Sequence, residues 1–437
     1  QQLGGDLPER GRRGDSRTRP ELSMFDMLLK GTGARTMSTP RALVRALVAI
    51  SRNKEIGPRL VPIVPDEART FGMEGMFRQM GIYAPEGQLY TPMDSGDIMP
   101  YREDKQGQLL QEGINEAGGM SSWIAAASAY SNHGVTMIPF YIYYSMFGFQ
   151  RFGDLAWAAG DLQARGFLVG GTAGRTTLNG EGLQHQDGHS QVFASFIPNC
   201  ISYDPTFHYE VAVIVHEGMR RMFQEQENVF YYLTTMNENY SHPDMPQGAE
   251  ENILKGLYHL SSSEAEKRGG KKSPRVQLLG CGTILNEVIA GAELLKNDFN
   301  ISADIWSATS FNELCRDGQD VERWNRLHPE QTPRVSHVEA CLKEREGPVI
   351  AATDYIKNFA EQIRPFVPAR YHALGTDGFG RSDSRQALRH HFEVDRYYVA
   401  ITALKALADE GTIPVKLVTG AIAQYGIDTD KPNPLTA

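Results

Sequence analysis

Cysteine is scarce in this chain of 437 residues, and its scarcity excludes two kinds of site. The four cysteines, Cys200, Cys281, Cys315 and Cys341, lie far apart and form no C-x-x-C pair. Such spacing supports neither a disulfide framework nor a zinc site, and it is typical of a reducing compartment. Long apolar runs are also missing, because no stretch approaches about 18 consecutive apolar residues. These absences predict a cytoplasmic protein without a membrane span.

An excess of positive charge is missing as well. The formal net charge is −9, whereas proteins that bind nucleic acid draw their affinity from clustered lysine and arginine. The five arginines between Arg10 and Arg19 are interleaved with acidic residues, so residues 1–22 are predicted to be a solvated linker. The chain has no secretory signal and begins with Gln1, from which we expect it to be the later part of a longer polypeptide.

What the chain does contain is an ordinary globular composition, with 41% hydrophobic and 22% charged residues. Its length predicts two or three domains. Strand-like apolar runs alternate with helical patterns, which favours an α/β fold with mostly parallel sheets covered by helices on both faces. A turn-rich segment that begins at Asn237 separates a first domain, residues 23–240, from a smaller second domain, residues 248–437.

Local signals predict where the main elements lie. Thr39 and Pro40 predict a helix with Thr39 as its N-cap and Pro40 in its first position. Further helices are expected at about 152–165, at 207–225 and in the run ILNEVIAGAELL. Buried strands are expected in these runs: LVPIVPDEA, VTMIPFYIYY, GFLVGG, NCISYDP, VFYYLTT, VQLLGCG, ISADIWSATS and PVIAATDY.

The most informative stretch is LLQEGINEAGGM, in which Glu116 opens a predicted helix. Its neighbours are small or apolar, so a buried Glu116 carboxyl would have a raised pKa and could exchange protons near neutrality. Gly118 and Gly119 are predicted to leave room beside the acid for a large flat group. The alternative is that Glu116 is a solvated acid on an amphipathic helix.

Two clusters follow this helix. Aromatic residues crowd the strand at 140–147, where they either line a cofactor site or pack in the core. The segment NGEGLQHQDGHS then places two histidines four residues apart, with Glu181 and Asp187 nearby. A helix could aim such a pair at a metal ion. Because Gly182 and Gly188 disfavour a helix, a polar loop that lines a cleft is the better interpretation.

Three other segments carry weaker signals. Asp66 and Glu67 follow a predicted strand at its carboxyl end, where open α/β sheets bind ligands, but they could equally be the first-turn acids of a helix. Residues 86–104 have little periodicity and are long for a connection, which is typical of a functional lid or a disordered loop. The segment GTDGFGRSD matches no complete phosphate loop and is predicted to be a structural turn.

Taken together, these stretches resemble one family. The sequences PDEARTFGMEGMFRQMGIY, LLQEGINEAGGMSSW, IPFYIYYSMFGFQRFGDLAWAAGD and GGTAGRTTLNGEGLQHQDGHS are similar to those of the homodimeric bacterial pyruvate dehydrogenase component, which depends on thiamine diphosphate. The resemblance extends through ALGTDGFGRSD to the final IDTDKPNP and so covers essentially the whole chain. It implies a pyrimidine-binding domain with a mostly parallel sheet and a smaller transketolase C-terminal-like α/β domain.

The resemblance also implies roles for single residues. Glu116 matches the glutamate that protonates the aminopyrimidine ring of the cofactor, and Phe147 matches the aromatic residue stacked on that ring. Tyr144 and His185 match residues that line the pyruvate pocket, where His185 could stabilise or protonate the developing alkoxide. Residues 86–104 match a mobile loop that orders over the bound intermediate. Other active-centre matches are Glu67 (catalytic), Asp66 and Arg151 (cofactor-binding) and Glu181 (substrate-binding), and Tyr144 is expected to contact the cofactor as well.

The implied reaction is oxidative decarboxylation of pyruvate. A thiamine diphosphate carbanion attacks the ketone, and the two-carbon unit passes to a lipoyl group of the dihydrolipoyl acetyltransferase component. The cofactor of this family lies between two subunits, which implies a homodimer. The family holds its diphosphate and Mg²⁺ in an upstream domain with a Gly-Asp-Gly motif. That motif is absent from these 437 residues, so no metal ligand is assigned to the chain.

Two other functions stay open. A transketolase-like two-carbon transferase would share the architecture, but a sugar phosphate would require basic residues around the pocket. The cluster from Glu181 to His189 is acidic and contains histidine, which disfavours that function. The second alternative is a non-catalytic assembly fragment whose later domain docks partners.

Overall fold

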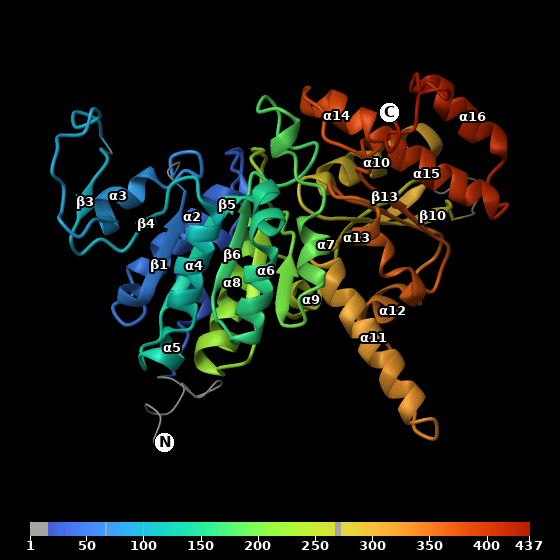
Figure 1. The fold of residues 1–437 in the computed structure, drawn as a ribbon. Helices are drawn as coiled ribbons and strands as arrows, with labels where there is room; N and C mark the ends of the chain where they lie inside the picture. The colour runs from blue at the N-terminus through green and yellow to red at the C-terminus, as the bar shows by residue number, and fades with distance from the viewer. Residues whose placement is uncertain (1–15, 66–67, 99, 267–271) are drawn as a thin grey trace. The chain divides into compact units, whose positions relative to one another are not determined.

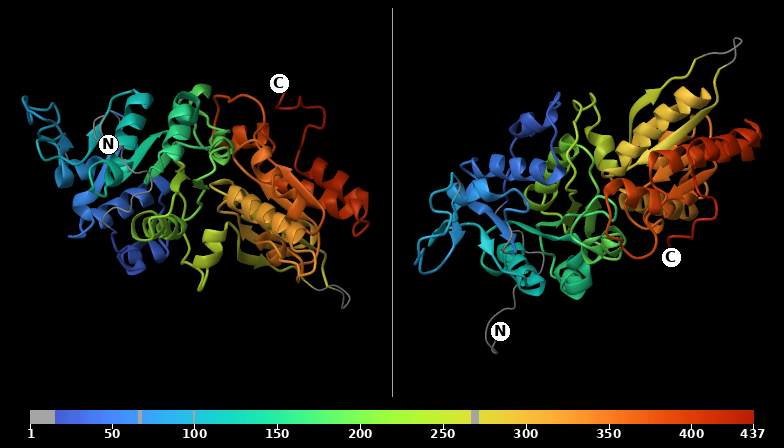
Figure 2. Two further views of the ribbon diagram at one scale, coloured as in Figure 1. Left: turned by 60° about the horizontal axis from the view of Figure 1, so that its bottom comes forward. Right: turned by 90° about the horizontal axis from the view of Figure 1, so that it is seen from above.

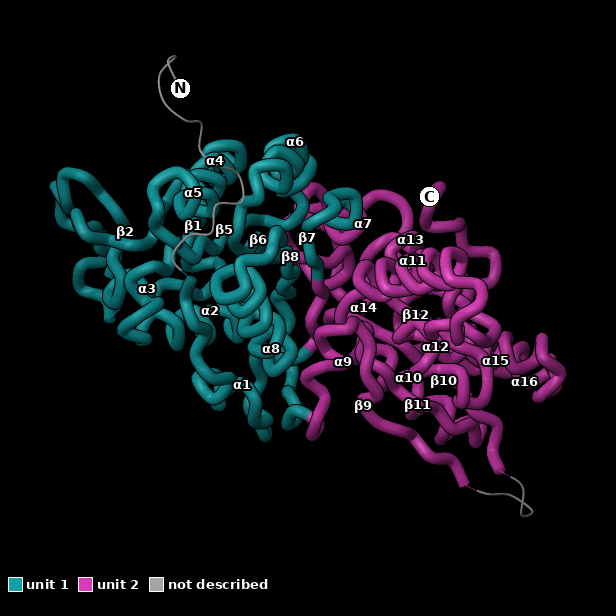
Figure 3. The backbone as a smooth tube through the Cα atoms, turned by 90° about the horizontal axis from the view of Figure 1, so that it is seen from below, with its two compact units in different colours: residues 1–172, 193–202, 207–245 teal, residues 173–192, 203–206, 246–437 magenta. Residues whose placement is uncertain are grey.

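The computed structural model of the protein describes residues 16–65, 68–98, 100–266 and 272–437, so Asp66 and Glu67 lie outside the described residues. The chain divides into two compact units (Figure 3). Unit 1 comprises Gln1–Thr172, Phe193–Ser202 and Phe207–Met245, and unit 2 comprises Ala173–Val192, Tyr203–Thr206 and Pro246–Ala437. The predicted domains, 23–240 and 248–437, remain predictions. Residues 173–192 and 203–206, which that prediction assigns to the first domain, cluster with unit 2.

A six-stranded sheet forms the centre of unit 1 (Figure 1). Its strand order is β4-β1-β5-β6-β8-β7, and the pairs β4–β1, β1–β5, β5–β6 and β6–β8 are parallel. The strands are β1 (Leu60–Val64), β4 (Leu110–Gln111), β5 (Ile138–Tyr144), β6 (Phe167–Gly171), β7 (Cys200–Tyr203) and β8 (Phe230–Thr234). Every residue of β1, β6 and β8 is buried, as expected of apolar strands covered on both faces. The prediction of a mostly parallel sheet is confirmed.

Helices cover both faces of this sheet. Figure 3 shows α4 (Glu116–Ala127) and α6 (Gly148–Asp161) on one side of the strands and α2 (Thr39–Ser51) and α8 (His208–Met219) on the other. The remaining helical elements of unit 1 are short: η1 (Leu22–Phe25), α1 (Asp26–Leu29), η2 (Gly57–Arg59), α3 (Glu74–Met80), α5 (Ala129–Asn132), η3 (Ser145–Phe147) and the π-helical turn η5 (Arg220–Gln224). Helix α7 (Ser190–Ser195) has residues in both units.

Three predicted helix boundaries need correction. The N-cap of α2 is Ser38, not Thr39, because the Thr39 hydroxyl accepts a hydrogen bond from the backbone N–H of Met236 at 2.9 Å. Helix α6 begins at Gly148, four residues before the predicted start, and has a non-helical residue at Phe152. The third predicted helix, 207–225, changes from α8 to the π-helical turn η5 at Arg220.

Unit 2 has a five-stranded sheet in the order β13-β12-β10-β11-β9, in which only β9 is antiparallel to its neighbour. The strands are β9 (Tyr258–Ser263), β10 (Arg275–Gly280), β11 (Ser302–Ser307), β12 (Val349–Ala352) and β13 (Tyr371–Leu374). Helix α10 (Ile284–Phe299) packs on the sheet and against α15 (Arg396–Asp409). The other helices are η4 (Leu183–His185), α9 (Glu250–Lys255), α11 (Phe311–Leu327), α12 (His337–Leu342), α13 (Asn358–Glu361), η6 (Arg364–Phe366), α14 (Arg385–His391) and α16 (Val415–Gln424).

The predicted loop 86–104 lies at the edge of unit 1 in both views of Figure 2. It ends in β3 (Glu103–Asp104), which pairs in parallel with β2 (Ile82–Tyr83). Between these two strands the described residues form no helix or strand, as the missing periodicity predicts. No helix within the described ranges is both long enough and apolar enough to cross a bilayer.

Candidate active site

The first turn of α4 fixes the position of Glu116. The side chain of Asn115 caps the helix, since its Oδ1 accepts a hydrogen bond from the backbone N–H of Gly118 at 3.0 Å. Glu116 is then the first residue of the helix, where an acid is favoured by the helix dipole. Its side chain is only 13% exposed. The capped first turn of α4 therefore fixes the position of the Glu116 side chain near the C-terminal ends of the strands.

The two glycines after Glu116 do not leave an empty space. A Cβ atom on Gly119 would lie 2.6 Å from the ring of Tyr141, and one on Gly118 would lie 2.7 Å from the Asn115 side chain. The large flat group beside the helix is thus Tyr141 itself, a residue of β5 that is 2% exposed. Burial and the nearby Glu116 and Glu112 raise the pKa of Tyr141, so its hydroxyl stays protonated and donates to the Glu116 carbonyl at 3.4 Å.

Arg151 joins the acid to the aromatic cluster. Its Nη1 lies 2.8 Å from Oε2 of Glu116, and its guanidinium carbon lies 4.1 Å from the centre of the Phe147 ring. The break in α6 at Phe152 follows directly after Arg151. One planar cation therefore contacts both the carboxylate and the aromatic face that the sequence singles out.

The aromatic run divides at the end of β5. Phe140, Tyr141 and Tyr143 are buried in the core, so the core interpretation holds for them. Tyr144 and Phe147 are only partly buried, and their ring centres lie 6.3 Å apart. Phe71 packs against Tyr144 with ring centres 5.3 Å apart. Unit 1 thus brings Glu116, Arg151, Phe147 and Tyr144 into one continuous set of contacts.

The other predicted site residues, Glu181 and His185, belong to unit 2. Nδ1 of His185 lies 3.6 Å from Oε2 of Glu181, and the side chains of Glu181 and His185 are 40% and 22% exposed. Asp187 and His189 do not join them. The Asp187 carboxylate accepts hydrogen bonds from the backbone N–H groups of His189 and Ser190, both at 2.9 Å.

The histidine cluster is not built as a metal site. Nδ1 of His189 lies 3.1 Å from Nη2 of Arg175, and burial together with that cation lowers the pKa of His189. In the described part of the chain, no three His, Cys, Asp or Glu side chains are grouped to hold a metal ion. Between Asn179 and Ser190 the backbone forms a loop with a single 3-10 turn, η4, as predicted, whereas the prediction that this loop lines a cleft stays a prediction.

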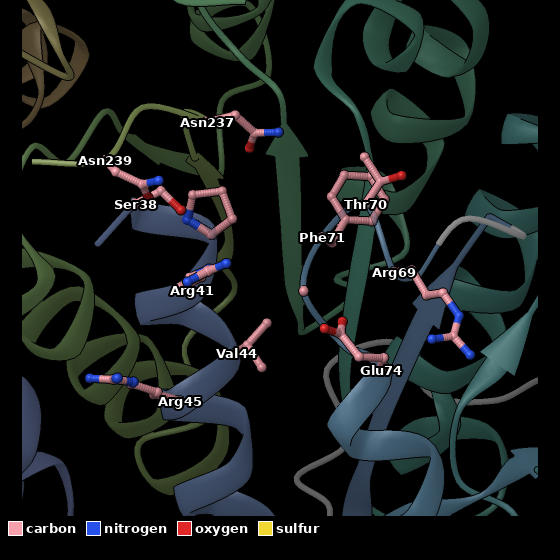
Figure 4. A pocket seen from close by; sticks show the side chains of 12 residues that line it. Ser38, Arg41, Val44, Arg45, Arg69, Thr70, Phe71, Glu74, Asn237 and Asn239 are labelled. Atoms are coloured by element: carbon pink, nitrogen blue, oxygen red, sulfur yellow. The ribbon is translucent and has the colours of Figure 1, made fainter. Parts of the chain in front are cut away.

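A hollow of about 510 Å³ lies in unit 1 next to the N-terminus of α2 (Figure 4). Its lining is polar and mixed in charge: Ser38, Pro40, Arg41, Val44, Arg45, Arg69, Thr70, Phe71, Gly72, Glu74, Asn237 and Asn239. Figure 4 shows that the guanidinium groups of Arg45 and Arg69 point away from Glu74, and Arg69 is paired with Asp94.

Comparison with known proteins identifies the family. Residues 21–243 match the model of the pyruvate dehydrogenase E1 component middle domain, and residues 256–395 match the transketolase-like C-terminal domain. The chain belongs to the pyruvate dehydrogenase E1 component family. It is 62% identical to the pyruvate dehydrogenase E1 components of Cupriavidus necator and Pseudomonas aeruginosa, over 100% and 99% of its own length. It spans about half of those relatives, 48% and 49% of their lengths.

Solved structures support the fold of this family member. A transketolase from Campylobacter jejuni superposes with a TM-score of 0.61 at 15% identity, covering 87% of this chain and 49% of that one. A split-gene transketolase, described as an inactive beta4 tetramer, superposes with a TM-score of 0.52 at 16% identity and covers 85% of this chain and 98% of that one. The predicted transketolase-like architecture with two α/β parts is confirmed.

Sequence reasoning missed the buried polar residues that hold the Glu181 loop. Asp354 is fully buried, and Arg175 is 2% exposed. Asp354 comes two residues after strand β12, so an acid shortly after a buried strand is the sequence signal that could have found it.

Proposed function

We propose that this chain carries part of the catalytic centre of a thiamine-diphosphate-dependent enzyme that oxidatively decarboxylates pyruvate and acetylates a lipoyl group. The proposal rests on the family and on the cluster of Glu116, Arg151 and Phe147. The acceptor would be the lipoyl domain of the dihydrolipoyl acetyltransferase component. When bound, thiamine diphosphate supplies the carbon nucleophile for the ketone and takes up the electrons released with carbon dioxide.

The position of the Arg151 guanidinium is the observation that carries the proposal. The guanidinium is flat, it bears N–H donors, it bonds to the Glu116 carboxylate, and it lies over the Phe147 ring. An aminopyrimidine ring is also flat and nitrogen-bearing, and it would need the same carboxylate and the same ring face. The arginine thus stands in for the pyrimidine part of the cofactor, and these residues fit that part. Cofactor binding would require the Arg151 side chain to move, which its 47% exposure permits.

The other residues would act on pyruvate and on protons. Glu116 would hold a proton shared with the ring nitrogen of the cofactor, while Phe147 orients that ring by stacking. Tyr144 would line the pyruvate pocket. His185 would stabilise or protonate the oxygen of the reacting ketone, with Glu181 as its charge partner at 3.6 Å. We assign Asp66 and Glu67 to the same centre from the family resemblance alone.

The diphosphate and Mg²⁺ would be bound by residues beyond these 437. The sequence has no Gly-Asp-Gly motif, and the described residues contain no cluster suited to a metal ion. The split-gene transketolase, whose chain is matched over 98% of its length, is described as inactive. This supports the proposal that the present chain carries only half of the cofactor site. We further propose a homodimer in which one subunit supplies the pyrimidine site and its partner the diphosphate site.

Calorimetric titration of thiamine diphosphate with Mg²⁺ into the 437-residue chain tests the proposal that this chain carries only half of the cofactor site. We expect no measurable binding until a diphosphate-binding segment of the family is added, after which both binding and pyruvate decarboxylation return. Tight binding of thiamine diphosphate to the chain alone would contradict this proposal.

Replacement of Glu116 tests the catalytic centre itself. In the reconstituted enzyme we expect Glu116→Gln to lower pyruvate decarboxylation by about 100-fold or more, because general acid–base groups contribute about 10²–10⁴-fold. The matched control is Glu112→Gln, since Glu112 is a nearby glutamate that accepts a hydrogen bond from Ser122 and has no role in the proposed site. Full activity of Glu116→Gln would favour the non-catalytic assembly function instead.

A further inference from the structure

The segment Ala173–Val192 is a loop with two buried ends and an exposed tip. Its first end, residues 173–178, is buried, and so are Gln186 and Asp187 at its second end. Between them, residues 179–185 are exposed or partly exposed, and this tip contains Glu181 and His185. The polar groups at both ends must be paired within the protein, because unpaired buried polar groups are costly.

Asp354 holds the first end of the loop. Its carboxylate accepts four hydrogen bonds: from the backbone N–H of Thr176 at 2.8 Å, its hydroxyl at 2.7 Å, the backbone N–H of Thr177 at 3.1 Å and its hydroxyl at 2.6 Å. All three residues have 0% exposure. Burial raises the pKa of Asp354, while Arg389 and the threonine donors oppose that rise. A single carboxylate therefore binds two consecutive residues of the loop.

The place where it binds them is the topological switch point of the unit 2 sheet. From β10 the chain continues to β11 on one side and later to β12 on the other, so β10 and β12 are neighbours whose connections run in opposite directions. Asp354 follows β12, and Thr283, whose Oγ1 lies 2.5 Å from Oγ1 of Thr177, follows β10. In open α/β sheets, ligands bind in the crevice at this point. Here the threonines occupy it.

Arg175 and Gln186 hold the loop to the turn after β13. Nη1 of Arg175 donates to the carbonyls of Thr376 and Gly378, the latter at 2.5 Å. Oε1 of Gln186 accepts from the backbone N–H of Arg381 at 2.7 Å, and its Nε2 donates to the Leu178 carbonyl at 3.0 Å. Burial lowers the pKa of Arg175, while the carboxylates of Asp187, Asp354 and Asp377 oppose that shift.

Two glycines allow these close approaches. Within the loop, a Cβ atom on Gly188 would lie 2.5 Å from the Arg175 guanidinium, and between turn and loop, one on Gly380 would lie 2.7 Å from the Leu183 carbonyl oxygen. The segment GTDGFGRSD, which the sequence predicts to be a structural turn, therefore also binds the loop 173–192.

We propose that unit 2 binds Thr176 and Thr177 as an internal ligand in its switch-point crevice, and that Asp354 and Arg175 thereby position Glu181 and His185 for substrate. The first half of this inference stands on the hydrogen bonds alone. The second half rests on the proposed function, because it assumes that Glu181 and His185 meet pyruvate. Asp354 and Arg175 would then be positioning residues of unit 2, which act on the reaction through Glu181 and His185.

Hydrogen exchange tests the first half without any assay of activity. In Thr177→Val, we expect amide exchange in residues 178–189 to accelerate by about tenfold or more, because one hydroxyl donor to Asp354 is lost. Thr309→Val is the matched control, since Thr309 is an equally buried threonine of unit 2 whose hydroxyl bonds to the Ile253 carbonyl at 2.6 Å. Thr177→Ser keeps the hydroxyl and should restore slow exchange. Equal exchange in the Val variants at positions 177 and 309 would overturn the internal-ligand inference.

Kinetics of the complete, cofactor-loaded enzyme test the second half. We expect Asp354→Asn and Thr177→Val to raise the KM for pyruvate at least fivefold while thiamine diphosphate affinity changes less than twofold, with Thr177→Ser close to the unmodified enzyme. A structural defect of the whole unit would weaken cofactor binding as well. An unchanged KM in a variant whose loop exchanges faster would overturn the positioning role.

The variant His185→Gln separates this outcome from failure of the proposed function. If His185→Gln leaves pyruvate kinetics unchanged, the substrate role of His185 in the proposed function is wrong. The exchange experiment still decides whether unit 2 holds the loop, because its result does not depend on any substrate.

Discussion

Gly119 shows how tightly a single residue is constrained beside the candidate site. Its Cα faces the ring of Tyr141 so closely that a methyl group would lie 2.6 Å from it. Tyr141 is 2% exposed and its hydroxyl is bonded to the Glu116 carbonyl, so the ring has little freedom to withdraw. We expect Gly119→Ala to lower the free energy of unfolding by about 1–3 kcal/mol, the usual cost of overpacking, as measured by denaturant unfolding.

Gly153→Ala is the control for that substitution. Gly153 also lies in a helix, α6, but no atom lies within 4 Å of the position of an added Cβ. Alanine should therefore raise the free energy of unfolding by up to about 1 kcal/mol, through helix propensity alone. If both variants shift stability in the same direction, the contact between Gly119 and Tyr141 is not the constraint that the geometry indicates.

At the scale of elements, the first turn of α4 depends on its cap. The Asn115 side chain satisfies the Gly118 N–H, and the next residue is Glu116. We expect Asn115→Ala to lower the free energy of unfolding by about 0.5–2 kcal/mol and to speed hydrogen exchange in the first turn of α4. Ser38, the N-cap of α2, makes no side-chain capping bond, so Ser38→Ala should cost much less. Equal losses in the two variants would contradict the capping role of Asn115.

At the scale of the whole molecule, buried histidines should make the protein sensitive to acid. The ring of His208 has 0% exposure and stacks on His242 with ring centres 4.6 Å apart. Burial, then His242 and Arg45, lower its pKa to about 4, while the Leu28 carbonyl and Asp244 oppose the shift. The unfolded chain, with an ordinary histidine pKa near 6.5, therefore binds more protons than the fold between about pH 6.5 and pH 4.

It follows that the free energy of unfolding is highest above about pH 6.5 and declines as the pH falls toward 4, by about 3 kcal/mol at most from His208. Burial lowers the pKa of other histidines too, namely His189, His216, His242, His259, His337, His372 and His391. Urea unfolding at several pH values measures the slope. His208→Gln should flatten it, whereas replacement of the exposed His133 should not, and an unchanged slope in His208→Gln would contradict the assignment.

Much of this architecture could be predicted because its signals are local. Apolar runs such as LVPIV and GFLVGG become strands β1 and β6, and the Asn115–Glu116 pair marks the start of α4. The errors arose where a distant partner competed with a local preference. Thr39 was predicted to cap α2, but its hydroxyl bonds to the N–H of Met236, far along the chain. Gly118 and Gly119 were likewise predicted to leave room for a large flat group, but the space beside Gly119 is filled by Tyr141, which comes from another element.

The sequence by itself determined the family and the α/β architecture, and it predicted the acid, aromatic and histidine residues of the candidate site. Those features depend on residue type and on short-range periodicity, which the order of residues contains directly. Only the tertiary structure decided that Arg151 bonds to Glu116 and covers Phe147, and that Asp354 and Arg175 hold the loop with Glu181 and His185. The physical reason is that such pairs join residues far apart in the chain, and they form because buried charges and donors must find partners wherever the fold brings them.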